Sequence, residues 1–382
     1  MAAKSLLTPV ALGSTTLRNR IGMSALTRSR ASGTVPNDVM REYYVQRARG
    51  GAGLIISEGV LITQQGTEWP EAPGIWSQAQ IDGWKNIVDA VHAEGSKIYA
   101  QLWHLGRLNH PAAPEQIAAG VPVYGPSAIM ARGGRFRHIP GVKDYVVPTE
   151  LPDPKTIIAL YKQAALNAKA AGFDGVEMHG ANGYLIHQFL DSSANQRTDS
   201  YGGSPKNRTR FALEAVAAAQ EVFGADVSIK LSPTGGNNDL GMPLPETVAT
   251  FGHLLQQLEA LPTKLAYVAF MRYNPLHDPI YPDADGKTRA TQFDVITTFK
   301  PYLKQTPLWA NSALSLEEAL AYVADGTAAG VFFGLNWIAH PDLVKRIEHG
   351  KPLDNQIDFA HLYGAEGVDP ALGYTDYKTA AY

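Results

Sequence analysis

The sequence predicts one α/β domain, residues 1–382, folded as an eight-stranded β/α barrel of the TIM type. Short apolar runs alternate with longer amphipathic stretches, and eight strands alternating with eight helices are typical of a barrel. Hydrophobic residues make up 45% of the chain and charged residues 18%, which is enough for a large core. An open doubly wound sheet is the structural rival, but no Gly-x-Gly-x-x-Gly motif follows the first predicted strand.

The predicted strands are mostly continuous apolar runs bounded by glycine or polar residues. This pattern is typical of a parallel strand that is covered on both faces. In chain order the predicted strands are Ile21–Met23, Leu54–Val60, Lys97–Leu102, Gly175–His179, Val227–Leu231, Lys264–Phe270, Leu308–Ala310 and Gly330–Phe333.

The predicted helices lie between and after these strands, and several carry start or stop signals. Ser315 precedes Leu316 and Glu318 in a pattern close to a capping box, and Gly95 and Gly172 follow their helices. The predicted helices are Asn37–Arg49, Gln78–Glu94, Pro154–Ala170, Lys206–Phe223, Pro245–Leu261, Gln292–Lys300, Leu316–Asp325 and Pro341–His349.

Two long irregular stretches interrupt this alternation. Residues 105–152, from Leu105 to Pro152, are rich in proline and glycine and too long for a simple connection. We interpret them as an inserted capping region after the third strand, a hairpin or lid over one barrel end. A second stretch, Met271–Arg289, follows the sixth strand. Because both follow strands, we expect both on the catalytic face of the barrel.

Composition excludes several classes of function. A net charge of −3 gives no electrostatic case for a nucleic acid or an anionic membrane, and no apolar run approaches a membrane span. The chain has no cysteine, so disulfides, thiolate catalysis and Cys-ligated metals are excluded. His104 and His179 have too few nearby carboxylates for a metal site. We expect a cytoplasmic protein; the small-molecule substrate and the monomeric or homodimeric state that we also expect follow from the family resemblance described below.

Three polar residues at the end of the fourth predicted strand are the strongest candidates for chemistry. His179 ends the strand, and Asn182 and Tyr184 follow it. In a barrel such positions face the mouth. His and Asn can each donate a hydrogen bond to an oxygen that gains negative charge, and Tyr can deliver a proton. A half-buried cluster with satisfied hydrogen bonds is the alternative.

Two further residues suit the edge of a bound ring. Gln101, near the end of the third strand, offers both a donor and an acceptor, although structural hydrogen bonding explains it equally well. Thr27, after the first strand, has a hydroxyl that could contact the same ring. A lone loop threonine more often has no such role, so Thr27 depends on context.

Longer motifs supply that context. The segment from His179 to Leu190, HGANGYLIHQFL, and residues 195–208, NQRTDSYGGSPKNR, closely resemble the old yellow enzyme family of flavin-dependent ene-reductases. The resemblance extends along nearly the whole chain. Further matching segments are Leu26–Arg30, Ala52–Glu58, Gln101–Arg107, Ile338–Leu343 and Gly373–Tyr377.

The resemblance implies a barrel that binds FMN, takes electrons from NAD(P)H and reduces activated C=C bonds in enones, enals or nitroalkenes. In the family pattern, His179 and Asn182 hold the carbonyl or nitro oxygen of the substrate, and Tyr184 protonates the α-carbon. The residues that the resemblance assigns to FMN are Ala25, Leu26, Thr27 at the flavin O4, Gly59 where the ring approaches, Gln101 at the pyrimidine edge, His179, Lys230, Asn311, Ser312, Gly334 and Leu335. It assigns Trp103 and Tyr363, with the three polar residues, to the substrate.

The phosphate end departs from the family pattern. Leu335 stands after Gly334 where the family usually has an arginine for the FMN phosphate, and Ser312 and Ala313 replace a glycine-rich turn. Lys230 replaces an arginine and cannot form a bidentate fork. Each lost charge-assisted hydrogen bond costs about 1.5–3 kcal/mol, or about one to two decades of affinity.

Two hypotheses follow from this departure. The first is an ene-reductase with rearranged phosphate binding, in which Lys230, backbone amides near Leu335, or Arg272 compensate. The second is a specialised homologue of secondary metabolism that has lost FMN. It would use His179, Asn182 and Tyr184 for redox-neutral isomerisation, cyclisation or elimination. A bound flavin distinguishes the two.

Overall fold

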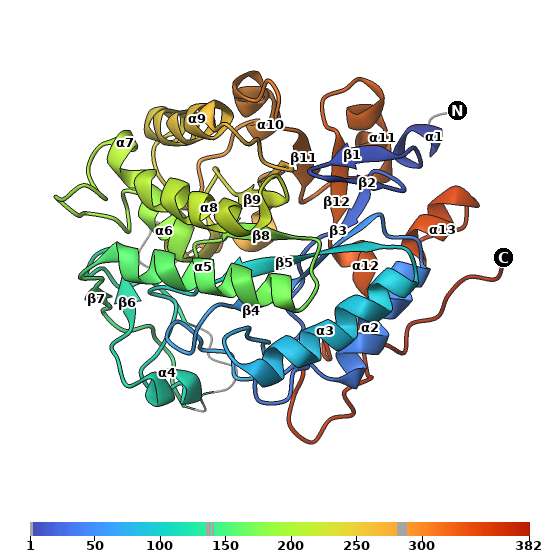
Figure 1. The fold of residues 1–382 in the computed structure, drawn as a ribbon, viewed down its shortest axis with the longest axis horizontal. Coiled ribbons are helices and arrows are strands. Elements are labelled where there is room, and N and C mark those ends of the chain that lie inside the picture. Colours follow the sequence, from blue (N-terminus) through green and yellow to red (C-terminus); the bar gives the residue numbers. More distant parts are fainter. Residues whose placement is uncertain (1–2, 135–138, 140, 281–288) are drawn as a thin grey trace.

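The eight barrel strands form one closed ring in which every neighbouring pair is parallel. Figure 1 shows the computed structural model, which describes residues 3–134, 139, 141–280 and 289–382. The predicted barrel is therefore confirmed. Its strands are β3 (Ile21–Met23), β4 (Leu54–Leu61), β5 (Lys97–Trp103), β8 (Gly175–Gly180), β9 (Val227–Leu231), β10 (Val268–Met271), β11 (Leu308–Asn311) and β12 (Gly330–Phe333).

Every residue of these strands is buried except Lys97, which explains the continuous apolar runs in the sequence. The sixth strand begins at Val268, four residues later than predicted. The preceding Leu265, Ala266 and Tyr267 are buried as well. An apolar pattern alone therefore could not separate them from the strand.

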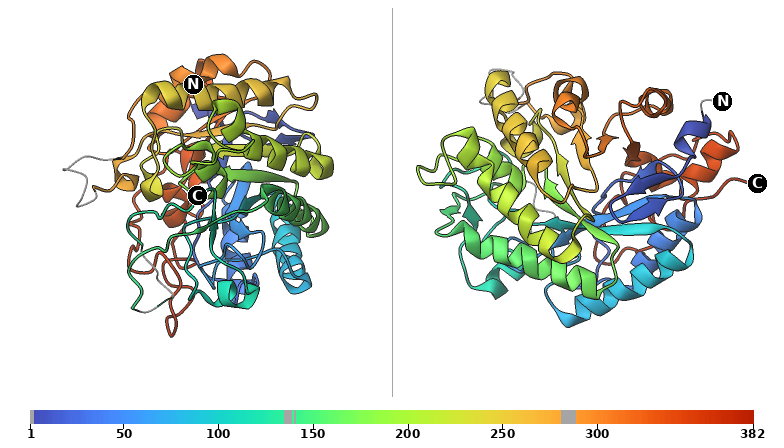
Figure 2. Two further views of the ribbon diagram at one scale, coloured as in Figure 1. Left: turned by 90° about the vertical axis from the view of Figure 1, so that its left-hand side faces the viewer. Right: turned by 45° about the horizontal axis from the view of Figure 1, so that its top comes forward.

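Helices surround the ring of strands, as Figures 1 and 2 show from three sides. The predicted helix over residues 206–223 is interrupted at Thr209, whose hydroxyl bonds the carbonyls of Pro205 and Lys206 at 2.9 and 3.1 Å. The helices after the barrel strands are α2 (Asp38–Arg49), α3 (Gln78–Ala93), α5 (Pro154–Ala170), α7 (Pro205–Arg208), α8 (Arg210–Phe223), α9 (Leu244–Ala260), α10 (Val295–Phe299), α11 (Leu316–Ala324), α12 (Leu335–Ala339) and α13 (Leu343–Glu348).

An N-terminal hairpin, which the sequence did not predict, packs on the barrel. It consists of β1 (Val10–Leu12) and β2 (Thr15–Leu17) after the short helix α1 (Ala3–Leu6). The backbone N–H and hydroxyl of Ser14 donate to the carboxylate of Asp226, directly before β9, at 2.8 and 2.6 Å. The hairpin therefore lies at the end of the barrel where the strands begin, opposite the catalytic face.

The inserted region of residues 105–152 contains α4 (Pro114–Ala119), β6 (Tyr124–Gly125) and β7 (Thr149–Glu150). β6 and β7 pair in parallel, so these two strands of the described part of the insertion do not form a hairpin with each other. A hairpin needs antiparallel strands joined by a tight turn, whereas here 23 residues separate the two strands, from 126 to 148. Of the two irregular stretches, residues 135–138, 140 and 281–288 lie outside the described residues.

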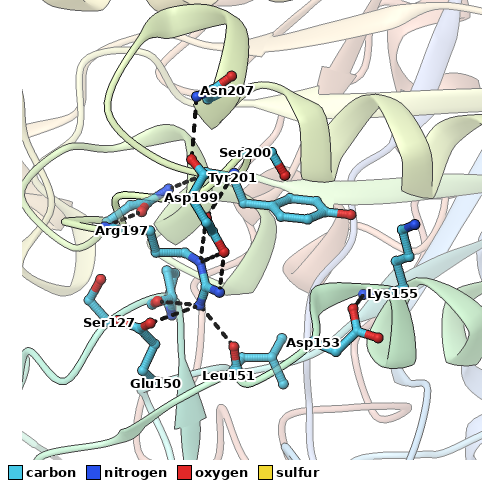
Figure 3. Close-up of polar contacts among 12 residues, drawn as sticks. Ser127, Glu150, Leu151, Asp153, Lys155, Arg197, Asp199, Ser200, Tyr201 and Asn207 are labelled. Carbon is cyan, nitrogen blue, oxygen red and sulfur yellow. Dashed lines mark hydrogen bonds and ion pairs between the residues drawn. The ribbon is translucent and has the colours of Figure 1, made fainter.

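The buried Arg197, which follows β8 in the chain, binds the insertion next to both of its strands (Figure 3). Arg197 Nη1 donates to the carbonyls of Pro126 and Leu151 at 3.0 and 2.8 Å. Its Nε and Nη2 meet the carboxylate of Asp199, and Glu150 lies 3.5 Å from Nη1. Residues 195–208, the longest family motif, thus contribute an anchor for the insertion.

Candidate active site

A cavity of about 580 Å³ opens where the barrel strands end, and we call it the inner chamber. Every barrel strand except β4 contributes a side chain at its carboxyl end or directly after it, as expected for a barrel active site. The lining includes Ser24, Ala25, Leu26, Thr27, Gln101, Trp103, His179, Asn182, Tyr184, Lys230, Met271, Asn311, Ser312, Phe333, Gly334, Leu335 and Tyr363. All predicted site residues except Gly59 therefore lie around one cavity.

A second cavity of about 560 Å³, the outer chamber, adjoins the inner one. The two share the side chains of Trp69, Tyr184, Leu276, His277 and Tyr363. The inserted region lines the outer chamber through Leu105, Leu108, Arg132, Gly133, Gly134 and Tyr145. The insertion and the loop after β10 therefore both lie on the catalytic face, as predicted.

His179, near the end of β8, is 6% exposed, and its Nδ1 has no hydrogen-bond partner among the described residues. Burial, together with the charges of Lys230 and His187, holds the pKa of His179 well below its usual range. The imidazole is therefore neutral at physiological pH and carries one N–H to donate. A buried polar atom without a partner, in a residue that lines a cavity, calls for an explanation such as a bound ligand.

Tyr184 is the N-cap residue of α6 (Leu185–Leu190), and this position turns its side chain into the junction of the two chambers. Its ring lies edge-on to those of Trp103 and His179, with centroids 4.9 Å apart in both pairs. Burial raises the pKa of Tyr184 well above its usual range. The phenol therefore keeps its proton until a strong acceptor comes close.

Asn182 lies between these two residues in the chain, with a left-handed backbone φ of 57°. Asparagine tolerates this conformation better than other non-glycine residues. The turn brings the Asn182 side chain to the wall of the inner chamber, next to His179 and Tyr184. The sequence-predicted trio therefore faces one space.

A buried carboxylate beneath the chamber fixes Gln101. Gln101 Nε2 donates to Glu177 Oε1 at 2.7 Å, and the Tyr267 hydroxyl donates to Glu177 Oε2 at 2.7 Å. Burial raises the pKa of Glu177, while the charge of Lys230 opposes this shift. Gln101 thus has a structural partner and also lines the chamber, so the two interpretations of this residue are compatible.

Lys230 supplies a buried cation to the inner chamber. Its Nζ donates to Ser24 Oγ at 3.1 Å, and Asn311 Nδ2 donates to the same oxygen at 2.9 Å. Burial lowers the pKa of Lys230, and Glu177 opposes that shift. An ammonium has three donors, so Lys230 keeps donors for a bound molecule.

The residues that β11, β12 and the segments after them contribute to the chamber have no charged side chain. Ser312 and Ala313 both have left-handed φ angles, 73° and 50°, which cost strain in non-glycine residues. Leu335 begins α12 and is 44% exposed. Arg272, the expected substitute, does not line the chamber and donates to Glu318 at 2.9 Å. Loops after the seventh and eighth strands often bind phosphate in these barrels.

Gly59 packs against Trp103, whereas the resemblance places it where the flavin ring approaches. It does not line the chamber, and an added Cβ would lie 2.4 Å from the Trp103 ring. Gly59 therefore makes room for Trp103, which itself lines the chamber. Thr27, Ala25 and Leu26 lie on the chamber wall as expected.

Several lining residues were not predicted from the sequence. Ser24 directly follows the first strand, and the rule that selected His179, polar residues at a strand's carboxyl end, would have found it. Asn237 and Asn238 follow two glycines and lie six and seven residues after the end of the fifth strand, too far for that rule. No such sequence pattern would have identified Trp69 as a lining residue.

Two further expectations from the sequence concern metal sites and membrane-spanning segments. In residues 3–134, 139, 141–280 and 289–382, no group of three His, Asp or Glu side chains could hold a metal ion. Among the same residues, no helix combines the length and apolarity needed to cross a bilayer.

Comparison with known proteins identifies the family. Residues 5–354 match the family model described as NADH:flavin oxidoreductase / NADH oxidase family. The chain belongs to this family. It is 35% identical to 12-oxophytodienoate reductase 7 of Oryza sativa subsp. japonica, over 94% of this chain and 91% of that protein. It is 37% identical to the NADP-dependent oxidoreductase lnbE of Aspergillus flavus, over 97% and 95%.

Solved structures agree with the sequence matches. The old yellow enzyme homologue from Zymomonas mobilis is 35% identical, with a TM-score of 0.85 over 98% of this chain and 99% of that one. Morphinone reductase is 37% identical, with a TM-score of 0.85 over 98% and 96%. The resemblance to the old yellow enzyme family, and the oxidoreductase class that it implies, are confirmed.

The inner chamber of this flavin oxidoreductase fits the ring of FMN. Trp103, Leu26 and Phe333 offer apolar surface for the ring faces, while Gln101 and Lys230 offer hydrogen bonds to its polar edge. His179, whose buried Nδ1 has no partner among the described residues, lines the same chamber. The phosphate end fits less well, because the described residues there offer backbone amides and hydroxyls rather than a guanidinium.

Proposed function

We propose that the protein reduces activated C=C bonds, with FMN in the inner chamber and NAD(P)H as the reductant. The overall reaction adds a hydride and a proton across the double bond and oxidises NAD(P)H to NAD(P)⁺. When bound, FMN would supply the hydride-transfer chemistry that couples oxidation of NAD(P)H to reduction of the alkene. One observation carries the proposal: the buried, unpartnered His179 lies beside Asn182 and Tyr184 on the wall of a single cavity.

His179 and Asn182 would hold the carbonyl or nitro oxygen of the substrate. Hydride addition to the β-carbon moves negative charge to that oxygen, and two preorganised donors stabilise it where it grows. A neutral imidazole suits this role, because it offers one N–H without the cost of burying a charge. The depressed pKa of His179 supports this assignment.

Tyr184 would deliver the proton to the α-carbon. Its position at the junction of the chambers, in ring contact with His179, puts the hydroxyl near the same substrate. Its raised pKa favours a phenol that gives up its proton only to a basic, carbanion-like carbon. Trp103 and Tyr363 would line the substrate side, and residues 105–152 would cap it.

Ala25, Leu26, Thr27 and Gln101 would hold the flavin ring from the chamber wall. At the phosphate end, Asn311, Ser312, Gly334 and the backbone of Leu335 would bind in place of an arginine, with Lys230, which shares the Ser24 hydroxyl with Asn311, as a neighbouring cation. A cytoplasmic location, from composition, and a monomeric or homodimeric state, from the family resemblance, remain predictions.

The test follows the saturated product. Purified protein is incubated with FMN, NADPH and cyclohexenone, and cyclohexanone is measured with and without each component. We expect product only when NADPH is present. Product of unchanged redox state that forms without NADPH or FMN would contradict the proposal and favour the flavin-free homologue.

A further inference from the structure

The loop after β9 holds Asn182 through three hydrogen bonds. The Asn182 N–H donates to Ser232 Oγ at 2.9 Å. Asn238 Nδ2 donates to the Asn182 carbonyl at 2.7 Å, and Asn237 Nδ2 donates to Asn182 Oδ1 at 3.0 Å. β8 and β9 are neighbours in the barrel, with His179 opposite Lys230, so the segments after them meet at the chamber.

The contact from Asn237 decides which end of the Asn182 amide is free. An amide has a carbonyl that only accepts and an NH₂ group that only donates. Since Asn237 engages the carbonyl, the NH₂ group remains to serve a ligand. With Asn237 in its present orientation, a flipped Asn182 amide would lose this bond and turn an acceptor toward a substrate oxygen, which is repulsive. The orientation seen in the structure is the one that can stabilise an oxyanion.

Asn238 lies beside both Asn182 and Tyr184. Besides its bond to the Asn182 carbonyl, it lines the outer chamber together with Tyr184. The side chain of Asn238 opposes the rise in the pKa of Tyr184 that burial causes.

Close packing keeps the two segments in contact. Gly183 has φ 80°, and a Cβ there would lie 2.7 Å from the Asn238 Cβ and 2.8 Å from the Asn237 carbonyl oxygen. Asn238 has φ 53°, a left-handed value that asparagine tolerates. The next residue, Asp239, accepts from the N–H and Nε of Arg132 in the inserted region, at 3.0 and 2.9 Å. The loop is thus held on both sides.

We propose that Asn237 and Asn238 are positioning residues for the reaction. Asn237 orients the amide of Asn182, and Asn238 holds the Asn182 backbone. This inference rests on the proposed role of Asn182. Neither asparagine needs to touch the reacting atoms.

A double-mutant cycle tests the role of Asn237. Asn237→Asp keeps the size of the side chain but removes its N–H donors, so kcat for cyclohexenone reduction should fall about tenfold or more, a part of the loss expected for a missing oxyanion donor. In an Asn182→Ala background the same change should cost less than about twofold, because the amide that it orients is gone. The matched control is Asn167→Asp, which loses a hydrogen bond to the Ile75 carbonyl far from the chamber and should leave kcat unchanged.

The second cycle tests Asn238. Asn238→Asp keeps a residue that tolerates the left-handed backbone, so folding is preserved, and thermal unfolding of each variant verifies this. We expect it to lower kcat about tenfold and to cost less than about twofold in an Asn182→Ala background, because the side chain that this backbone positions is gone. Equal losses in both backgrounds would show a merely structural effect and overturn the positioning role.

Different results would contradict the positioning role and the proposed function. A large loss in Asn182→Ala together with an unchanged Asn237→Asp would overturn the positioning role alone. Unchanged turnover in Asn182→Ala itself would contradict the proposed function and, with it, the role of Asn237.

Discussion

Leu335→Arg should tighten the binding of FMN. Leu335 stands at the start of α12, on the wall of the inner chamber, where the loops after the last two strands meet. An arginine there would add a charge-assisted hydrogen bond to a phosphate, worth about 1.5–3 kcal/mol in a buried site. Because Leu335 is 44% exposed, solvent screening reduces this gain to about 1–2 kcal/mol, or about a five- to thirtyfold lower Kd.

The assay compares two flavins that differ only in the phosphate. Apoprotein is titrated with FMN and with riboflavin, and the flavin fluorescence gives each Kd. FMN should bind more tightly to Leu335→Arg than to the wild type, whereas the Kd of riboflavin should not change. The gain for FMN should also shrink as salt is added.

A matched control uses Leu166, which lies on α5 and is also 44% exposed. Leu166→Arg adds the same charge far from the chamber and should alter neither Kd. An equal gain for riboflavin and FMN, or an unchanged Kd for FMN, would refute the assignment of this end of the chamber to the phosphate.

Three further predictions concern other parts of the molecule. His179→Ala should lower kcat for enone reduction about a hundredfold, and near-normal turnover would contradict its oxyanion role. Arg197→Ala should lower the free energy of unfolding by about 2–4 kcal/mol, because two buried carbonyls lose their donor, while turnover per folded molecule stays within about twofold. Burial raises the pKa of Glu58 from 4.5 to about 7, so the folded state binds this proton more tightly than the unfolded state. Stability from this group is therefore greatest below about pH 4.5 and falls by up to about 3 kcal/mol as pH rises through about 7. Urea unfolding of Glu58→Gln should show a stability advantage over the wild type that grows with pH, and a constant difference would count against the shift.

The barrel and the site trio were predictable because both depend on local pattern. Strands that are buried on both faces appear as continuous apolar runs, and the rule for strand ends then selects His179 and Asn182. Other features depend on contacts between distant segments. The parallel pairing of β6 with β7, the place of Gly59 beneath Trp103 and the bond from Asn237 to Asn182 each join residues at least 24 positions apart. No spacing within the sequence encodes them.

The absorption spectrum of the purified protein under anaerobic conditions tests the central claim most directly. After reconstitution with FMN and removal of free flavin, the protein should show the visible flavin band. NADPH should bleach the band, and cyclohexenone should restore it while one equivalent of cyclohexanone forms. A protein that retains no flavin after reconstitution, or a bleached band that cyclohexenone does not restore, would contradict the assignment as an ene-reductase.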